Sequence, residues 1–155
     1  MGDREEGITM RLSEQKTIVE HCRRNWEDAV ALIQASLAKL QPYNPDHVRT
    51  PDDREPYDAL SDRFIRAVET ALKFFRSYER LQFAEESDTL RDRLNRMEKL
   101  ELISSVELWF EMREVRNRIV HDYLPNEVKQ IYADLMGPFS KELIDCSARA
   151  QNLAL

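Results

Sequence analysis

Apolar residues recur at intervals of three and four positions along most of this chain. That spacing is the period of a helix with one buried face, whereas a half-buried strand alternates every second residue. Only three glycines occur in 155 residues, and such scarcity favours helices over a turn-rich β fold. We therefore predict an all-α protein, whose length fits a single domain spanning residues 1–155.

Helix caps and prolines divide the pattern into segments. The first helix is expected to begin near Ser13, a residue type that caps helices, and residues 1–12 are expected to be flexible. Three prolines between Gln41 and Pro56 predict an extended, proline-rich connection over residues 41–56. The second helix is expected from Pro56, whose fixed φ angle suits a first helical turn.

Shorter helical segments follow. Ser87 or Asp88 can cap a third helix, and Ser104 or Ser105 can cap a fourth, which is expected to end near Tyr123. A fifth stretch begins after Leu124-Pro125 and meets Gly137-Pro138, where a kink is expected because proline lacks the helical N–H. The predicted architecture is an antiparallel bundle of four to five helices with a kinked C-terminal helix.

Composition excludes several classes of function. The net charge of −6 argues against broad binding of nucleic acid, so any RNA contact must be confined to a local basic cleft. Cys22 and Cys146 lack metal-ligand spacing and are expected to be reduced core thiols. No phosphate loop, nucleotide fingerprint or metal cluster is present, so we expect no cofactor and no metal. Without a membrane span or a signal peptide, the protein is expected in the cytoplasm.

The fourth helix carries two faces that differ from a solvated surface. With Leu108 as the origin of a helical wheel, the residues within about 40° of it form a seam that should face the core. These residues are Met112, Val115 and Ile119. The opposite side carries Val106, Phe110, Arg113, Asn117 and His121. Because Val106 and Phe110 are poor choices for solvent, this side is predicted to be an interface with another copy or another protein.

The end of this helix carries a short motif. Arg116, with Asn117 directly after it, is followed by His121 and Tyr123, and this spacing resembles the R-X4-H-X-Y signature of HEPN domains. The run Met112-Arg113-Glu114-Val115-Arg116-Asn117 and the later Ile131-Tyr132 also look like that group. Close resemblance covers roughly Leu108 to Leu135, while the remainder agrees in the order and length of its helices.

The resemblance implies a helical bundle that forms a homodimer with its motif-bearing helices adjacent. Many HEPN proteins are metal-independent ribonucleases, and in toxin–antitoxin pairs the HEPN chain is the toxin while its partner is a nucleotidyltransferase. In that group the motif tyrosine, here Tyr123, is the hydroxyl that the partner modifies with AMP. Other HEPN relatives look like non-catalytic substrate-binding subunits of a nucleotidyltransferase.

The residues suit cleavage of RNA without metal. His121 can act as base or acid near neutral pH, and Arg116 supplies donors for the phosphate, so both are predicted to be catalytic. Asn117 and Arg113 are predicted to bind phosphate or RNA or to orient the histidine. Since one chain offers a single well-placed histidine, a symmetric dimer would bring two copies to one cleft.

Three hypotheses remain open at this stage. The leading one is a homodimeric endoribonuclease toxin with a cognate nucleotidyltransferase antitoxin, and the alternative is a non-catalytic substrate- or nucleotide-binding partner of a small nucleotidyltransferase. The third is a structural bundle in which the motif arose by chance. In such a bundle, His121 would only interact with the helix dipole, Arg116 would pair with a glutamate such as Glu111, and Tyr123 would pack its ring against the end of the bundle.

Overall fold

A computed structural model of the chain describes residues 2–121 and 124–155, and within these ranges the regular secondary structure is entirely helical. The elements are α1 (Gly2–Leu37), α2 (Pro51–Phe83), α3 (Leu90–Lys99), α4 (Val106–His121), α5 (Pro125–Asp134), the π-helical segment η1 (Leu135–Phe139) and α6 (Ser140–Gln151). The prediction of an all-α bundle with a kinked C-terminal helix is confirmed.

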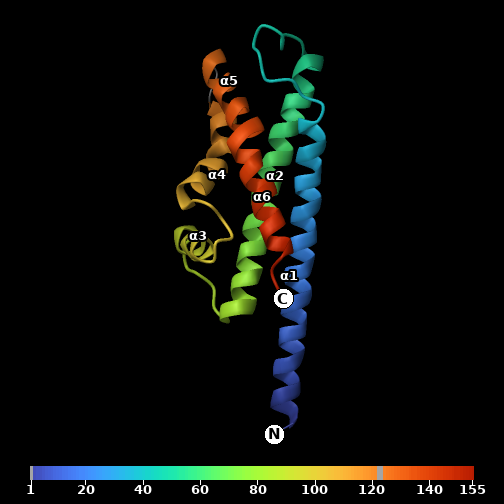
Figure 1. The fold of residues 1–155 in the computed structure, drawn as a ribbon, viewed down its shortest axis with the longest axis vertical. Coiled ribbons are helices and arrows are strands. Elements are labelled where there is room, and N and C mark those ends of the chain that lie inside the picture. Colours follow the sequence, from blue (N-terminus) through green and yellow to red (C-terminus); the bar gives the residue numbers. More distant parts are fainter. Residues whose placement is uncertain (1, 122–123) are drawn as a thin grey trace.

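Two long antiparallel helices, α1 and α2, form the spine of the molecule (Figure 1). The rod formed by α5, η1 and α6 packs against this pair, while α3 and α4 lie beside α2. Gly137, with φ −109° and ψ −110°, together with Pro138 makes the bend in this rod. The bend lets Phe139 stack on Phe64 of α2 at 6.0 Å between ring centroids.

An aromatic cluster fills the centre of the bundle. Trp26 of α1 lies 5.5 Å from Phe74 and 5.6 Å from Phe75 of α2, and Phe75 lies 5.1 Å from Trp109 of α4, measured between ring centroids. All four side chains are buried. Burial of one such ring stabilises the fold by about 1.5–3 kcal/mol, so the cluster fixes α4 against the two long helices.

Two expected helix starts were wrong. Helix α1 begins at Gly2 rather than near Ser13, so the described part of residues 1–12, expected to be flexible, is helical. Helix α2 begins at Pro51 rather than Pro56, because Thr50 and Asp53 form a capping box. The Thr50 hydroxyl accepts a 3.1 Å hydrogen bond from the Asp53 N–H, and the Asp53 carboxylate accepts one of 3.1 Å from the Thr50 N–H.

The connection between α1 and α2 is therefore shorter than predicted and is packed against the bundle. The Tyr57 hydroxyl of α2 donates a 2.6 Å hydrogen bond to the Gln41 carbonyl. The Tyr43 ring packs against those of Tyr57 and Tyr132, at 5.1 and 4.7 Å between centroids, and these two rings also contact each other at 5.4 Å. Burial of Tyr132, with the nearby charge of Asp58 as a smaller cause, raises the pKa of its phenol to about 12.

The caps of the shorter helices were predicted in part. Helix α3 is capped by Thr89, whose hydroxyl accepts a 3.1 Å hydrogen bond from the Asp92 N–H, and not by Ser87 or Asp88. Ser105 caps α4 as one of the two residues proposed, since its hydroxyl accepts a 3.3 Å hydrogen bond from the Leu108 N–H. Ser87 has another partner, because its hydroxyl donates to the buried carboxylate of Glu79 at 2.8 Å.

Candidate functional site

Helix α4 is oriented by Trp109, Met112 and Val115, which are all buried in the core. Of the four residues that the helical wheel placed in the core seam, Met112 and Val115 are buried as predicted, whereas Leu108 and Ile119 are only partly buried. The larger Trp109 ring determines the rotation of the helix, because it buries more apolar area than Leu108 can. Val106, one turn before Trp109, is therefore also buried, and its predicted exposure at an interface is wrong.

This rotation directs Arg113, Arg116 and Asn117 outward, toward α2. Together with residues of α2 they line a hollow of about 200 Å³. The lining residues on α2 are Ile65, Val68 and Glu69. Three of the four residues predicted to bind or cleave RNA thus lie at one hollow.

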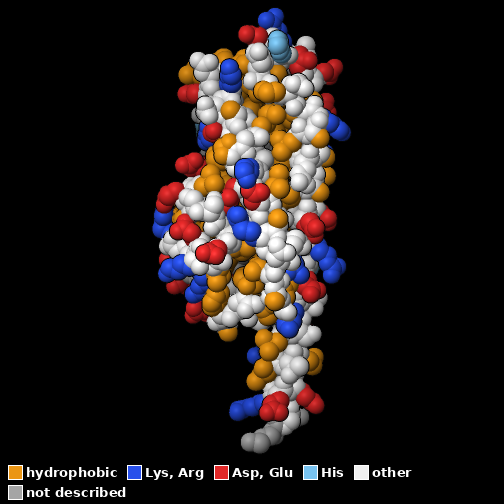
Figure 2. Space-filling model, in the orientation of Figure 1, with side chains coloured by type: hydrophobic (Ala, Val, Ile, Leu, Met, Phe, Trp, Pro, Cys, Tyr) orange, Lys and Arg blue, Asp and Glu red, His pale blue; other side chains and the backbone are white. Residues whose placement is uncertain are grey.

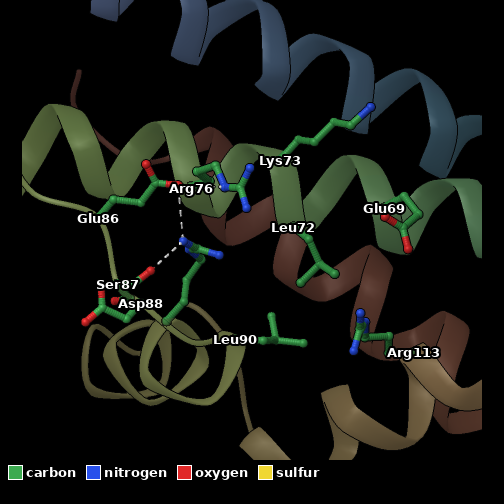
Figure 3. A pocket seen from close by; sticks show the side chains of 10 residues that line it. Glu69, Leu72, Lys73, Arg76, Glu86, Ser87, Asp88, Leu90 and Arg113 are labelled. Atoms are coloured by element: carbon green, nitrogen blue, oxygen red, sulfur yellow. Dashed lines mark hydrogen bonds and ion pairs between the residues drawn. The ribbon is translucent and has the colours of Figure 1, made fainter.

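A second and larger hollow, of about 600 Å³, continues from the first. Its lining includes Leu72, Lys73 and Arg76 on α2, Leu90 on α3 and the loop between them, and in Figure 3 the Leu72 side chain points toward Leu90 while that of Lys73 points away from it. The two hollows share Glu69 and Arg113. They form one channel between α2, α3 and α4, which we call the α2–α4 groove.

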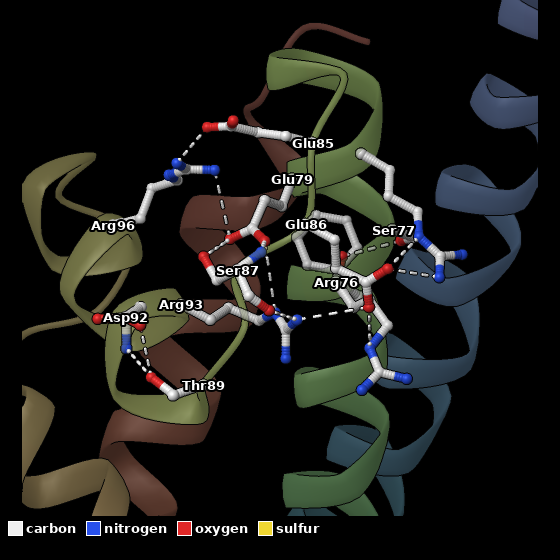
Figure 4. Close-up of polar contacts among 12 residues, drawn as sticks. Arg76, Ser77, Glu79, Glu85, Glu86, Ser87, Thr89, Asp92, Arg93 and Arg96 are labelled. Carbon is white, nitrogen blue, oxygen red and sulfur yellow. Dashed lines mark hydrogen bonds and ion pairs between the residues drawn. The ribbon is translucent and has the colours of Figure 1, made fainter.

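An ion-pair network holds one wall of this groove (Figure 4). Glu86 pairs with Arg76 at 2.9 Å, with Arg80 at 2.6 Å and with Arg93 at 3.5 Å. The hydrogen bond from Arg80 is the main cause that lowers the pKa of Glu86, while partial burial opposes it. The loop before α3 is thereby tied to the last turns of α2.

Beneath this wall lies the fully buried carboxylate of Glu79. It accepts hydrogen bonds from the backbone N–H and the hydroxyl of Ser87, and it lies 3.8 Å from Arg93 Nε and 3.6 Å from Arg96 Nη1. Arg93 is itself only 8% exposed at its side chain, and its Nη2 donates to the Ser87 carbonyl at 3.1 Å. Arg93 is therefore fixed between the carboxylates of Glu79 and Glu86, and it orders the edge of the groove.

The remaining motif residues are arranged differently from expectation. Asn117 donates a 2.9 Å hydrogen bond from Nδ2 to Glu114, so its predicted role of orienting His121 is not what the described residues show. Of the residues described, His121 is exposed at the end of α4 and is not among those that line the groove. The predicted AMP acceptor, Tyr123, lies outside the described residues.

The apolar surface of α4 also differs from the prediction. Phe110 is half-buried, and the guanidinium carbon of Arg91 from α3 lies 4.5 Å from its ring centroid. Larger apolar exposure occurs around the C-terminal end of α4, at Val120 (56% exposed) and Leu124 (63%). These two residues flank His121 in sequence, so an interface at this end would include the histidine.

Sequence reasoning missed the groove residues outside α4. Glu69, Lys73 and Arg76 follow one another at helical spacing, and this polar strip beside the core stripe of α2 was a usable signal. Arg93 offered no comparable signal, because its burial depends on how α3 packs against α2. A charged side chain on a short helix usually lies in solvent.

The sequence model of the family described as "Nucleotidyltransferase substrate binding protein like" matches residues 23–152, and the chain belongs to that family. This family is an all-α HEPN-like group, so the resemblance is confirmed at that level, and the match does not single out the toxin subgroup.

Searches among curated proteins and among solved structures found no significant match. Within the described part of the chain, every helix is too short or too polar to cross a membrane.

Proposed function

We propose that this chain is the non-catalytic, substrate-binding partner of a separate nucleotidyltransferase. The observation that carries the proposal is the family match over residues 23–152. The α2–α4 groove supplies a place for the substrate. The alternative weighed from the sequence is thus favoured over the ribonuclease toxin, which was the leading hypothesis.

The groove suits an acceptor substrate that carries a phosphate or another anionic group. Lys73, Arg76 and Arg113 line it from two helices, and Arg116 extends the positive surface along α4. Guanidinium groups bind phosphate oxygens through paired hydrogen bonds, which fix the orientation of the bound group. Because the chain has a net charge of −6, an anionic ligand must be bound by a local basic surface, and the groove offers one.

The acidic residues of the groove would act on the remainder of the substrate. Glu69 lies between the two hollows, and Asp88 lies at the loop end. Carboxylates accept hydrogen bonds from hydroxyl or amino groups, so an acceptor with both anionic and hydroxyl or amino groups fits best. The chain would hold this acceptor, and the nucleotide chemistry would take place on the partner enzyme.

Titration of ¹⁵N-labelled protein with ATP, used as a phosphate-bearing probe, tests the groove. The largest amide shifts are expected at Arg113, Arg116 and Lys73, and Arg113→Glu should weaken binding at least about tenfold, or 1.4 kcal/mol. Arg66→Glu is the matched control, because Arg66 lies on α2 with 73% of its side chain exposed and pairs with Asp62. Equal weakening by both substitutions would rule out a specific site.

The ribonuclease toxin remains a second candidate because of the R-X4-H-X-Y motif. It requires Arg116 and His121 to act together, with the second histidine coming from a homodimer. The test is incubation of the purified protein with RNA in EDTA. Cleavage that is lost in His121→Ala and kept in His21→Ala supports the toxin, whereas equal cleavage by both variants, or none by the wild type, rejects it.

The homodimer itself is proposed at the outer face of α4. Its candidate contacts are now Phe110, Val120 and Leu124, since Val106 is buried within the chain. Light scattering of the wild type and of Val120→Glu is the direct test. A dimer that dissociates in this variant supports the interface, and a wild-type monomer at high concentration rejects it. Modification of Tyr123 by AMP stays a proposal that depends on the toxin hypothesis.

A further inference from the structure

The first half of α1 extends past the end of the bundle. In Figure 1 the helix continues beyond the end of α2 toward the N-terminus, and no other helix of the described residues lies beside this part. Val19 is the first residue of α1 to be fully buried, and Arg23 marks the bundle end, since it donates to the Leu153 carbonyl at 3.1 Å. The family match begins at residue 23, so this projection lies outside the matched segment.

The buried stripe of α1 does not stop where the bundle stops. Val19, Trp26 and Ile33 are spaced by seven residues and are fully buried. The same face of the helix continues outward through Leu12, seven residues before Val19, and Ile8, four residues before Leu12, and these side chains are 46% and 59% exposed. Figure 2 shows hydrophobic side chains along this projecting part. An exposed apolar stripe, or seam, on one face of a projecting helix is a surface on which a second helix can pack as in a coiled coil.

Charge is distributed unevenly around this exposed seam. Arg4, Arg11 and Lys16 fall within about 90° of it on the helix. Three acids, Glu6, Glu14 and Glu20, lie on the opposite half. One further acid, Glu5, lies on the seam side beyond Ile8. The positions that flank a coiled-coil seam form the interhelical ion pairs that select the partner.

A hollow accompanies the seam. Arg4, Gly7, Ile8 and Arg11 line a space of about 350 Å³ on this helix, and a Cβ added at Gly7 would meet nothing within 4 Å. Gly7 thus leaves the helix surface open between the side chains of Arg4 and Arg11.

From these features we infer that residues 4–19 form a docking helix for an amphipathic helix of a partner protein with acidic residues beside its apolar seam. A second copy of this chain is the poorer occupant. In a parallel pair Arg11 would face Lys16 of the copy, and in an antiparallel pair the arginines would face one another. A membrane surface is also poorer, because the seam is narrow and the polar face carries three glutamates, which anionic lipids repel.

The test uses a synthetic three-heptad peptide with leucine at the seam positions and glutamate at the flanking ones, labelled for fluorescence anisotropy. The full-length protein should bind it, and Ile8→Glu combined with Leu12→Glu should weaken binding more than about tenfold. Met10→Glu is the matched control, because Met10 is 66% exposed and lies away from the seam. A second peptide with lysine at the flanking positions should bind weakly to the wild type and more tightly after reversal of Arg4, Arg11 and Lys16 to glutamate.

Several results would overturn the inference. Equal binding of both peptides, or loss of binding in Met10→Glu, would mean non-specific adhesion. Absence of binding while circular dichroism shows an intact helix would reject the surface. Dimerisation that depends on Ile8 would identify a second copy as the occupant, and binding to phosphatidylserine vesicles in place of the acidic peptide would identify a membrane. None of these outcomes depends on the α2–α4 groove, so they leave the proposed function untouched.

Discussion

Glu142 of α6 accepts a 3.0 Å hydrogen bond from the indole Nε1 of Trp109 on α4. Glu142 also accepts from the backbone N–H of Ser104 at 2.9 Å and from its hydroxyl at 2.8 Å. Arg149 balances the charge of this buried carboxylate at 3.3 Å. One side chain of the last helix therefore holds the start of α4, the helix that carries the candidate site.

Glu142→Ala should lower the free energy of unfolding by about 3 kcal/mol. The buried Trp109 indole N–H would stay without an acceptor, which costs about 1–3 kcal/mol, and the two hydrogen bonds from Ser104 would also be lost. Urea unfolding followed by circular dichroism measures the change. The control is Glu107→Ala, which removes an ion pair with Arg91 in which Glu107 is 72% exposed and should cost under about 1 kcal/mol. A similar loss in both variants would contradict the structural role of Glu142.

Thr50→Ala should destabilise the protein by about 1 kcal/mol, because it removes the side-chain cap of α2. The same substitution at Thr17 serves as the control. Its hydroxyl donates to the Ser13 carbonyl within α1 and caps no helix end, so the change should stay within about 0.5 kcal/mol. Thermal unfolding distinguishes the two. An unchanged stability of Thr50→Ala would place the start of α2 nearer Pro56, as the sequence had suggested.

Glu86 should contribute a pH-dependent part of the stability. Its folded pKa is lowered, mainly by the Arg80 hydrogen bond. The contribution is therefore complete above the unfolded pKa, about 4.5, and is lost as the pH falls through the lower folded pKa. Wild type and Glu86→Gln should differ in urea midpoint at pH 7, and the difference should shrink below pH 4.5. A difference that grows in acid would contradict this sign.

The two cysteines should differ in reactivity. Cys146 is fully buried and donates to the Leu102 carbonyl at 3.0 Å, and burial is the main cause that raises the pKa of its thiol. Cys22 is partly exposed. Ellman's reagent should label one thiol in the native protein and two in urea, because only the thiolate reacts. Cys22→Ser should remove the native reaction, and rapid labelling of that variant would show that Cys146 is accessible.

The sequence alone was sufficient for the class of fold. Helical periodicity and scarce glycine predicted an all-α bundle, and Gly137-Pro138 predicted the bend in the last helix. These inferences succeeded because periodicity and proline act locally, within one or two turns of helix. The predicted start of α2 at Pro56 was wrong, because α2 begins at Pro51. Thr50 and Asp53 form a capping box that is itself a local signal, but the predicted start at Pro56 rested on the prolines.

The rotation of α4 was decided by tertiary packing. A wheel based on Leu108 gave equal weight to all apolar residues, whereas the folded chain places the Trp109 ring against Phe75 and its indole N–H against Glu142. That rotation buries Val106 and directs Arg113, Arg116 and Asn117 into the groove, with Asn117 bonded to Glu114 rather than set beside His121.

The sequence by itself thus determined the helices, the bend and the residues of the motif. The tertiary structure decided which residues share a site. Arg93 joins Lys73, Arg76 and Arg113 at the groove because α3 is fixed to α2 through the buried Glu79, a contact between residues that no local pattern connects. Burial and ion pairing across helices depend on packing of the whole bundle, and for that reason one half of the candidate site became apparent only in the folded chain.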